Sequence, residues 1–339
     1  MEQYVGLDVS QKETAICVID STGVKLWEGT CRSTPDAIAG ALKQRAPAAT
    51  RVGMETGPLA VWHWHALKKL GVPLVCLHAR QAKAALSLQA NKTDRNDAHG
   101  LAQIVRTGWY RAVEMKSLDS HELRVMLQAR QRLVGMRTTL YNQVRGLLKT
   151  FGVVLPRGKG RTFLTLVRAR VAELPMLQLA LEALLSAWRE VHQQVASLDR
   201  AIRRAAKERE ICRRWMRMPG IGPLTALAFH TAIDVPTRFR RSKDIGPYLG
   251  LTPTRYQSGE IDQAGRISKC GDRMTRSLLF EAAGVLLSRS RAPSALKEWG
   301  HAIARRAGYS KARVAVARKL GVIMHRLWID GTEFVAAVA

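Results

Sequence analysis

Acidic residues are scarce in this chain of 339 residues: 27 Asp and Glu stand against 54 Lys and Arg, a formal net charge of +27. Such an excess of cations indicates a polyanionic partner, because each phosphate that is neutralised releases condensed counterions. Nucleic acid is the expected partner. An anionic membrane surface is the alternative, but the sequence has no long apolar run and no amphipathic anchor, so no membrane partner is expected.

Cysteines are few and scattered: the chain has five, and none forms a C-x-x-C pair. This argues against both a zinc knuckle and a disulfide framework, so we expect reduced thiols. The first ten residues, MEQYVGLDVS, contain no basic segment followed by an apolar stretch, so no signal peptide is expected either. Both observations favour a cytoplasmic protein.

Strand-forming segments are concentrated in residues 1–112, which we expect to be the first domain. Short β-rich runs occupy 4–9, 14–19, 24–31, 51–55 and 73–78, and helical patterns follow the third, fourth and fifth of them. The order β-β-β-α-β-α-β-α predicts an α/β domain with a mixed five-stranded sheet flanked by helices.

The second predicted domain, residues 113–210, contains two apolar heptad patterns, which favour a coiled coil or a long helical hairpin. The two predicted seams consist of Met126, Ala129, Leu133, Met136, Leu140 and Leu147, and of Leu177, Leu181, Leu184, Trp188, Val191, Val195, Leu198 and Ile202. Arg130, Arg137 and Arg145 lie on the first helix. They could form a solvated helix face, but given the overall charge, contact with a nucleic-acid backbone is equally expected.

The third predicted domain, residues 211–339, is mainly helical and begins with RMPGIGPLTALAFHTA at residues 217–232. Gly220 and Gly222 form a tight turn ahead of an apolar helix, as in helix–hairpin–helix modules, whose free N–H groups bind a phosphate at a helix start. A purely structural turn is the alternative.

A Gly- and Arg-rich segment over residues 248–283 is predicted to be a loop that leads into a helix. It contains Ser258 in the tripeptide QSG, and nearby cations are candidate phosphate contacts: Arg255, Arg266, Lys269 and Arg273. From the residues alone, a serine before glycine is most simply a turn former.

Four carboxylates form the candidate catalytic group. Asp8 and Glu55 end the first and fourth predicted strands, and Asp94 and Asp97 lie on one face of the helix that follows the fifth. Each has a simple alternative role, as a strand-end turn former or as a helix cap. Together they match the hard oxygen ligands of a two-Mg²⁺ site, and in a phosphate-binding protein four converging acids would weaken DNA binding unless cations offset them.

The motifs GLDVS, METG and KTDRNDA, followed much later by GLTP, QSG and GRISKCGD, resemble those of the DEDD transposases of insertion sequences. This group is related to Piv-type DNA invertases and is described as bridge-RNA-guided recombinases. The resemblance covers essentially the whole chain. It implies an RNase H/RuvC-like first domain, a coiled coil, and a C-terminal domain with a serine nucleophile.

By this resemblance Asp8, Glu55, Asp94 and Asp97 are ligands of Mg²⁺, with Mn²⁺ as a substitute, and Ser258 is the nucleophile. The active site would be composite, with the acids of one subunit meeting the serine of another. A structured non-coding RNA would pair with target and donor DNA. Gln257 stands where family members often have a second serine, so the subgroup is left open.

The expected function is therefore that of an RNA-guided transposase that exchanges DNA strands through a phosphoserine intermediate. Three alternatives remain: a RuvC-like Holliday-junction resolvase, a Piv-type invertase without a guide RNA, and a non-catalytic nucleic-acid-binding protein. The heptads and the need to join two duplexes predict a homodimer, and a tetramer in the recombination complex. The expected location is the bacterial cytoplasm, in association with the nucleoid.

Overall fold

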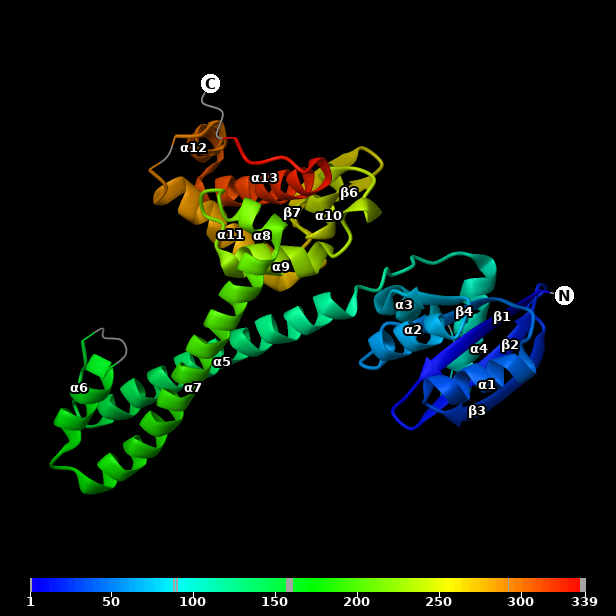
Figure 1. Cartoon of the computed structure of the whole chain (residues 1–339), viewed down its shortest axis with the longest axis horizontal. Coiled ribbons are helices and arrows are strands. Elements are labelled where there is room, and N and C mark those ends of the chain that lie inside the picture. Colours follow the sequence, from blue (N-terminus) through cyan, green and yellow to red (C-terminus); the bar gives the residue numbers. More distant parts are fainter. Residues whose placement is uncertain (1, 88, 90, 157–160, 292, 336–339) are drawn as a thin grey trace. The chain divides into compact units, whose positions relative to one another are not determined.

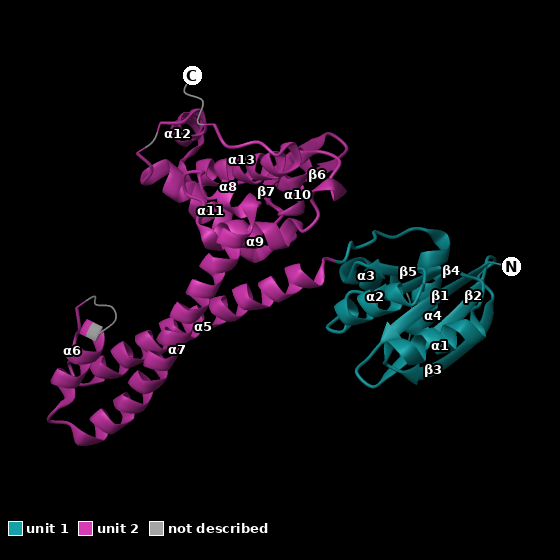
Figure 2. Ribbon diagram, in the orientation of Figure 1, with its two compact units in different colours: residues 1–115 teal, residues 116–339 magenta. Residues whose placement is uncertain are grey.

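The computed structural model describes residues 2–87, 89, 91–156, 161–291 and 293–335. The chain forms two compact units, residues 1–115 and 116–339 (Figure 2). The first ends three residues beyond the predicted first domain. The predicted boundary at residue 210 falls inside the second unit.

Unit 1 contains the predicted mixed five-stranded sheet, which the structure confirms, in the order β3-β2-β1-β4-β5. The first three strands are antiparallel neighbours, and β4 is parallel to both β1 and β5. The strands are β1 (Gln3–Val9), β2 (Glu13–Asp20), β3 (Lys25–Arg32), β4 (Ala49–Glu55) and β5 (Leu74–Leu77).

Helices cover both faces of this sheet (Figure 1). They are α1 (Pro35–Arg45), α2 (Ala60–Lys69), α3 (Ala79–Leu86) and α4 (Asp94–Thr107). Ile38 of α1 and Leu67 of α2 share a core with one face, while Ala82 of α3 and Leu101 of α4 share a core with the other. Residues of β2 from Thr14 to Asp20 are all buried, as expected for a strand that is covered on both sides.

Two long antiparallel helices, α5 (Leu118–Thr150) and α7 (Pro175–Glu208), form a helical hairpin in unit 2, with α6 (Arg161–Val171) near its far end (Figure 1). In the predicted seam of α7, Leu181, Trp188, Val195 and Ile202 are buried and the other four residues are half-buried, while Leu185 outside this seam is buried as well. Pro175 occupies the first turn, as its missing N–H allows.

The predicted seam of α5 is wrong by one residue. The buried positions are Leu123, Leu127, Val144 and Leu148, whereas Met136 of the predicted seam is 44% exposed. Apolar residues occur on two adjacent flanks of this helix, so periodicity alone could not choose between them. Packing against α7 determines which flank is buried. Between Leu127 and Val144, the face of α5 toward α7 carries Arg130 and Arg137, which contact residues of α7.

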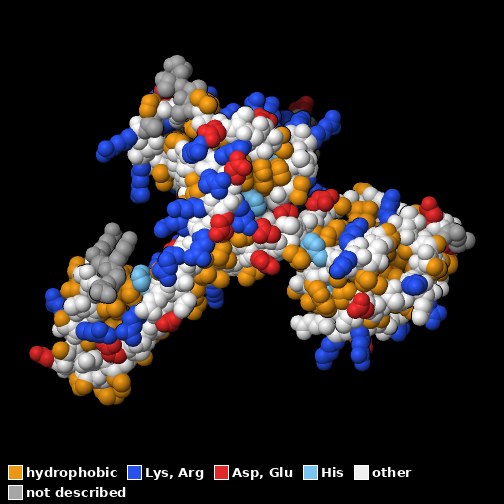
Figure 3. All heavy atoms as spheres, in the orientation of Figure 1, with side chains coloured by type: hydrophobic (Ala, Val, Ile, Leu, Met, Phe, Trp, Pro, Cys, Tyr) orange, Lys and Arg blue, Asp and Glu red, His pale blue; other side chains and the backbone are white. Residues whose placement is uncertain are grey.

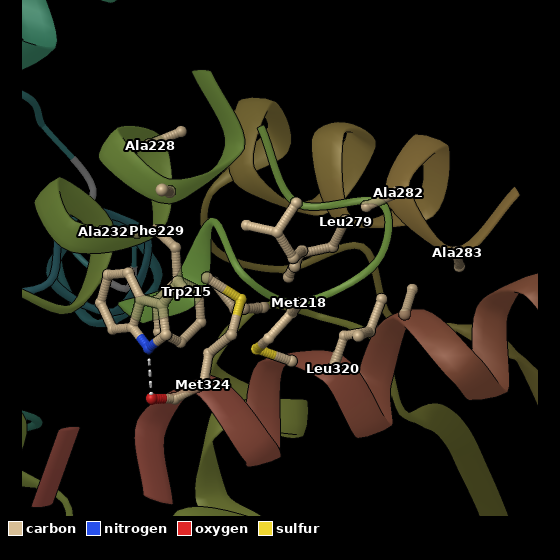
Figure 4. Close-up of a cluster of buried hydrophobic side chains, with 14 of the residues drawn as sticks. Trp215, Met218, Ala228, Phe229, Ala232, Leu279, Ala282, Ala283, Leu320 and Met324 are labelled. Carbon is tan, nitrogen blue, oxygen red and sulfur yellow. Dashed lines mark hydrogen bonds between the residues drawn. The ribbon is translucent and has the colours of Figure 1, made fainter. Parts of the chain in front are cut away.

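The C-terminal part packs several helices around Trp215, whose indole N–H donates to the carbonyl of Met324 at 2.8 Å (Figure 4). Leu123 and Ile202 from the base of the helical hairpin join the same core, which explains why one unit spans residue 210. The elements are α8 (Glu210–Trp215), α9 (Pro223–Ile233), η1 (Pro236–Arg238), η2 (Ser242–Asp244), α10 (Ile245–Tyr248), α11 (Arg273–Ser288), α12 (Ala295–Ala307) and α13 (Tyr309–Asp330).

The segment that was predicted as a loop over 248–272 is mostly a β-hairpin, which corrects that expectation. Strands β6 (Pro253–Ser258) and β7 (Ile261–Ile267) pair antiparallel, and Gly259 enters the turn at φ +55°. All residues of β6 are exposed, so neither face carries the apolar alternation that identifies a strand in a sequence.

None of the helices in the described ranges is both long and apolar enough to cross a bilayer.

Candidate active site

Asp8 and Glu55 lie next to each other at the carboxyl ends of two neighbouring strands. Strands β1 and β4 are parallel neighbours in which Leu7 pairs with Met54, so the next residue of each strand is one of the two acids. Both acids are half-buried. The parallel pairing therefore places the two carboxylates next to each other at one end of these strands.

The first turn of α4 carries the other two acids. Thr93 is the N-cap of this helix, and its hydroxyl accepts the N–H of Asn96 at 3.2 Å. The alternative role of Asp94 as the cap is thus filled by another residue. Asp97 is only 8% exposed and Asp94 is exposed.

Close packing of α4 on the sheet brings its first turn to these strand ends. A Cβ atom on Gly6 of β1 would lie 2.0 Å from the carbonyl oxygen of Ala98 and 2.5 Å from the nitrogen of Ala102. On β4, a Cβ atom on Gly53 would lie 2.5 Å from Val105. The two glycines let the helix backbone approach the strands more closely than side chains would permit.

The four carboxylates act on one another electrostatically. Burial, followed by the negative charges of Asp94, Asp97 and Glu55, raises the pKa of Asp8 to about 6. Burial and then Asp97 raise the pKa of Glu55 as well, and Lys92 opposes both shifts. Asp8 therefore lies within electrostatic range of the other three acids, and Glu55 within range of Asp97.

Across the described part of the chain, none of the four carboxylates makes a hydrogen bond or an ion pair. Four acids that form no ion pair provide hard oxygen donors of the kind that Mg²⁺ takes, and a divalent cation would relieve their repulsion. The donor set therefore fits this cation chemically. The same described residues contain no group of three potential ligands already close enough to hold one ion, so binding requires these side chains to close in.

Ser258 belongs to unit 2 and lies at the tip of the β6–β7 hairpin, where it pairs with Ile261 across the turn. Its side chain is exposed. Within the hairpin, the Nε atom of Arg255 donates to Asp262 at 2.6 Å, so this predicted phosphate contact has an intramolecular partner. The predicted nucleophile, Ser258, is therefore exposed to solvent at the turn of the hairpin.

The other predicted phosphate contacts of this region are exposed. Arg266 and Lys269 lie at the base of the hairpin, and Arg273 is the first residue of α11, directly after its N-cap Asp272. In the residues that the structure describes, none of these three cations has an ion pair.

The predicted arginines of α5 are engaged inside unit 2. Arg130 pairs with Asp199 at 2.6 Å, and Arg137 lies 3.4 Å from Nδ1 of His192. The Nη1 atom of Arg145 donates to the carbonyl of Pro156 at 2.9 Å. The corrected seam explains this, since Arg130 and Arg137 lie on the face that packs against α7.

Sequence reasoning missed the exposed cations of α7. These residues lie off the Trp188–Ile202 seam and have no ion pair within the described ranges: Arg200, Arg203, Arg204 and Lys207. Figure 3 shows Lys and Arg side chains gathered along this part of the helical hairpin. The sequence could have revealed them, because the predicted heptad seam of α7 already separates residues that face α5 from residues that face outward.

The two glycines of the predicted phosphate turn differ in their surroundings. Gly220 has φ +87°, and a Cβ atom there would lie 2.5 Å from the carbonyl oxygen of Ala282 on α11. Gly222 is the N-cap of α9, and a Cβ atom there would meet nothing within 4 Å. The tight turn thus has a packing role at Gly220, while phosphate binding at this helix start stays a prediction.

Comparison with known proteins gives matches in both halves of the chain. Residues 5–152 match a family model for DEDD transposases of IS110, described as "Transposase". Residues 212–318 match a model described as "Transposase IS116/IS110/IS902 family".

Individual relatives extend over most of the chain. The transposase for insertion sequence element IS1111A of Coxiella burnetii is 28% identical over 337 residues, which cover 96% of this chain and 89% of that protein. The putative transposase y4pF/y4sB of Sinorhizobium fredii is 30% identical over 280 residues, covering 80% and 71%. The transposase for IS1328 of Yersinia enterocolitica is 27% identical over 255 residues, covering 73% and 75%.

The four acids lie within the first matched segment and Ser258 within the second. The chain is therefore a DNA transposase and belongs to the IS110/IS116/IS902 family.

Proposed function

We propose that this transposase is a Mg²⁺-dependent, RNA-guided recombinase that mobilises its insertion sequence through a phosphoserine intermediate. The observation that carries the proposal is the convergence of Asp8, Glu55, Asp94 and Asp97, which repel one another and form no ion pair among the described residues. A structural role would be served better by one paired acid than by four unpaired ones.

In the proposed reaction, the Ser258 hydroxyl attacks a DNA phosphodiester. A bond from phosphorus to serine oxygen forms as the bond to the departing strand breaks, and that strand leaves as a hydroxyl after taking a proton. A hydroxyl of the incoming strand then attacks the phosphoserine and releases the serine. The bond energy is kept, so exchange needs no hydrolysis.

The four acids would hold the cation, which polarises the phosphate and activates the hydroxyl. Since the serine stands at an exposed tip in unit 2 and the acids in unit 1, we propose a composite site in which the two come from different subunits. The Ser258 side chain has no hydrogen-bond partner in the described structure, so no neighbouring group there activates its hydroxyl. The proposed cation would supply this activation.

The exposed cations of α7 support a nucleic-acid partner beyond the DNA at the active site. We propose that they bind the structured guide RNA, which would pair with target and donor DNA. RNA that stays bound to the purified protein at moderate salt, and is lost from a variant with Arg200, Arg203 and Arg204 changed to Gln, would support this role. An unchanged RNA content would contradict it.

Assembly is proposed at the far end of the helical hairpin. In the first turns of α7, Met176 is 78% exposed and Leu179 is 69% exposed. Val154, which follows the end of α5, is 75% exposed. Figure 3 shows hydrophobic side chains on the surface at this end of the helical hairpin. Such apolar exposure favours an interface with a second copy. We propose a dimer, and a tetramer when two duplexes are joined. Light scattering of Met176→Glu/Leu179→Glu should show loss of the dimer.

The experiment that tests the reaction uses end-labelled DNA, Mg²⁺ and protein purified with the RNA of its own element. On a denaturing gel, the wild type should form a covalent protein–DNA adduct that Ser258→Ala and Asp94→Asn both abolish. The matched controls are Ser268→Ala, a serine at the base of the same hairpin, and Asp36→Asn, an exposed acid in the first turn of α1. Both should retain the adduct.

Free nicks that survive Ser258→Ala but require Asp94 would overturn the phosphoserine step and indicate a RuvC-like resolvase. Recombination without RNA would indicate a Piv-type invertase. Metal binding is tested independently of activity: Mg²⁺ or Mn²⁺ should raise the melting temperature of the wild type, and should raise it much less in Asp97→Asn.

A further inference from the structure

A cationic groove lies beside the base of the β6–β7 hairpin, between β7 and the first turns of α13. Its volume is about 860 Å³. The wall on α13 includes Lys311, Val314 and Arg318, which lie on one face of the helix, and the opposite wall includes Arg266 and Ile267. The concavity thus joins the element that carries Ser258 to a long, well-packed helix.

The charges of this groove are of one sign. Arg266, Lys269, Lys311 and Arg318 line it, and none of its lining residues is acidic. All four side chains are exposed, and within the described part of the chain none of them makes an ion pair or a side-chain hydrogen bond. This contrasts with Arg255 on the same hairpin, which is paired with Asp262.

The groove also has apolar lining residues. Leu251 is buried, while Ile267, Val314 and Ala315 are half-buried, and all four line the groove. A purely solvated basic patch has no need for such apolar lining. A groove lined by both cations and apolar side chains suits a single strand, whose phosphates can contact the cations and whose sugars and bases can contact the apolar groups.

One end of the groove is the start of α13. Ser310 lies in the first turn and lines the groove, and the N-cap Gly308 offers no side-chain cap. The free N–H groups of this turn add a positive end that suits a phosphate. From Ser310 to Arg318 the helix rises roughly 12 Å, about the length of three or four nucleotide steps.

We propose that this groove binds a single strand of DNA and leads it toward Ser258. Pro253 lines the groove and Ser258 ends the same strand β6. Five residues of extended chain span roughly 16 Å, or about five nucleotide steps. A strand held at Lys311 and Arg318 would reach the hairpin tip within that length. This inference rests on the proposed function, because it takes Ser258 as the point of attack.

The test measures binding of single-stranded DNA by full-length protein in a Ser258→Ala background, where no adduct can form. The variant Lys311→Gln/Arg318→Gln is compared with Arg305→Gln/Arg306→Gln, which removes two exposed arginines from α12 in the same unit. The groove variant should lose roughly tenfold in affinity, and the slope of log affinity against log salt should fall by about 1.4. The α12 variant should change affinity less than about twofold.

Several outcomes would overturn the proposal. Equal loss in both variants would mean that the groove is only part of a diffuse basic surface. A loss confined to single-stranded RNA of the same sequence, or to duplex DNA, would assign the groove to another nucleic acid. Unchanged binding of single-stranded DNA by Lys311→Gln/Arg318→Gln would show that the groove does not bind this strand. Because the background variant lacks the nucleophile, these results do not depend on whether the phosphoserine reaction occurs.

A second measurement covers the case in which the groove variant folds poorly. Single-stranded DNA with 4-thiothymidine at successive positions is photocrosslinked to the Ser258→Ala protein, and the modified peptides are mapped. Crosslinks should fall in the peptides that contain Ile267 and Val314. Crosslinks confined to other peptides would refute the proposed path.

Discussion

Asp234 holds the start of α5 through both of its carboxylate oxygens: Oδ2 accepts the N–H of Ser117 at 2.8 Å, and Oδ1 accepts the Ser117 hydroxyl at 2.6 Å. The hydroxyl of Ser120 donates to the same Oδ1. Burial acts against the charge, but these hydrogen bonds together hold the pKa of Asp234 below its ordinary value. The contact joins the end of α9 to the first turn of α5.

We expect Asp234→Ala to lower the free energy of unfolding by about 2–3 kcal/mol, since three donors would lose a charged acceptor. Asp234→Asn should cost less, because Asn keeps one acceptor oxygen for these donors. Asp330→Ala, which removes the exposed pair with Arg326, is the control and should change stability by about 0.5 kcal/mol or less. Urea denaturation measures all three, and equal values for Asp234→Ala and the control would contradict the clamp.

Gly6→Ala should displace α4 from β1 and destabilise unit 1 by about 3 kcal/mol, because the added methyl would overlap the carbonyl of Ala98. It should also reduce the stabilisation by Mg²⁺, since Asp94 and Asp97 move with the helix. Gly57→Ala is the matched control, because a Cβ atom there meets nothing within 4 Å. Thermal denaturation with and without Mg²⁺ checks both effects, and a stable Gly6→Ala protein would refute the packing argument.

The pair Gly220→Ala and Gly222→Ala separates packing from phosphate binding. Gly220→Ala should cost about 2 kcal/mol or more, because the backbone is left-handed there and Ala282 blocks the methyl group. Gly222→Ala should leave stability nearly unchanged. If Gly222→Ala weakens DNA binding while the fold is intact, the turn also binds phosphate; unchanged binding would limit the motif to its structural role.

Lys116 should make stability depend on pH. Its ammonium group donates to the carbonyl of Thr231 at 2.8 Å, and burial, followed by repulsion from Arg124, lowers the pKa of Lys116 to about 8. The unfolded chain keeps this proton up to its ordinary pKa of 10.5. Between these values the unfolded state binds more protons, so the contribution of Lys116 to stability rises as pH increases.

Relative to Lys116→Met, the wild type should therefore gain on the order of 2 kcal/mol of stability from pH 8 to pH 10. Lys149→Met, at an exposed position of α5, is the control. Urea denaturation at a series of pH values provides the comparison. A constant difference between wild type and Lys116→Met over this range would show that Lys116 has no displaced pKa.

Local signals were sufficient for much of the fold. Alternating β-rich runs with turns between them located the five strands of unit 1, and the apolar heptad pattern located the long helix α7. The acids were found because carboxylates at strand ends and in a first turn are conspicuous in a chain with so few acids. These features depend on neighbouring residues, which a sequence displays directly.

The remaining features depend on partners that are distant in the chain. The α5 seam was misplaced because α7 selects the inner face, and this selection places Arg130 opposite Asp199. The β6–β7 hairpin escaped notice because its residues are exposed on both sides, so only its backbone pairing defines it.

By itself, the sequence determined the cationic character of this transposase, its α/β first unit and its candidate acids, since composition and short-range periodicity carry that information. Ser258 was identified as the candidate nucleophile only by the resemblance of its motif to those of the family. Only the tertiary structure decided that Gly6 lets α4 approach β1, which arginines are already paired, and that Lys311 and Arg318 form a groove with β7. Those outcomes depend on contacts across tens of residues, and the packing of buried backbone and side chains selects them.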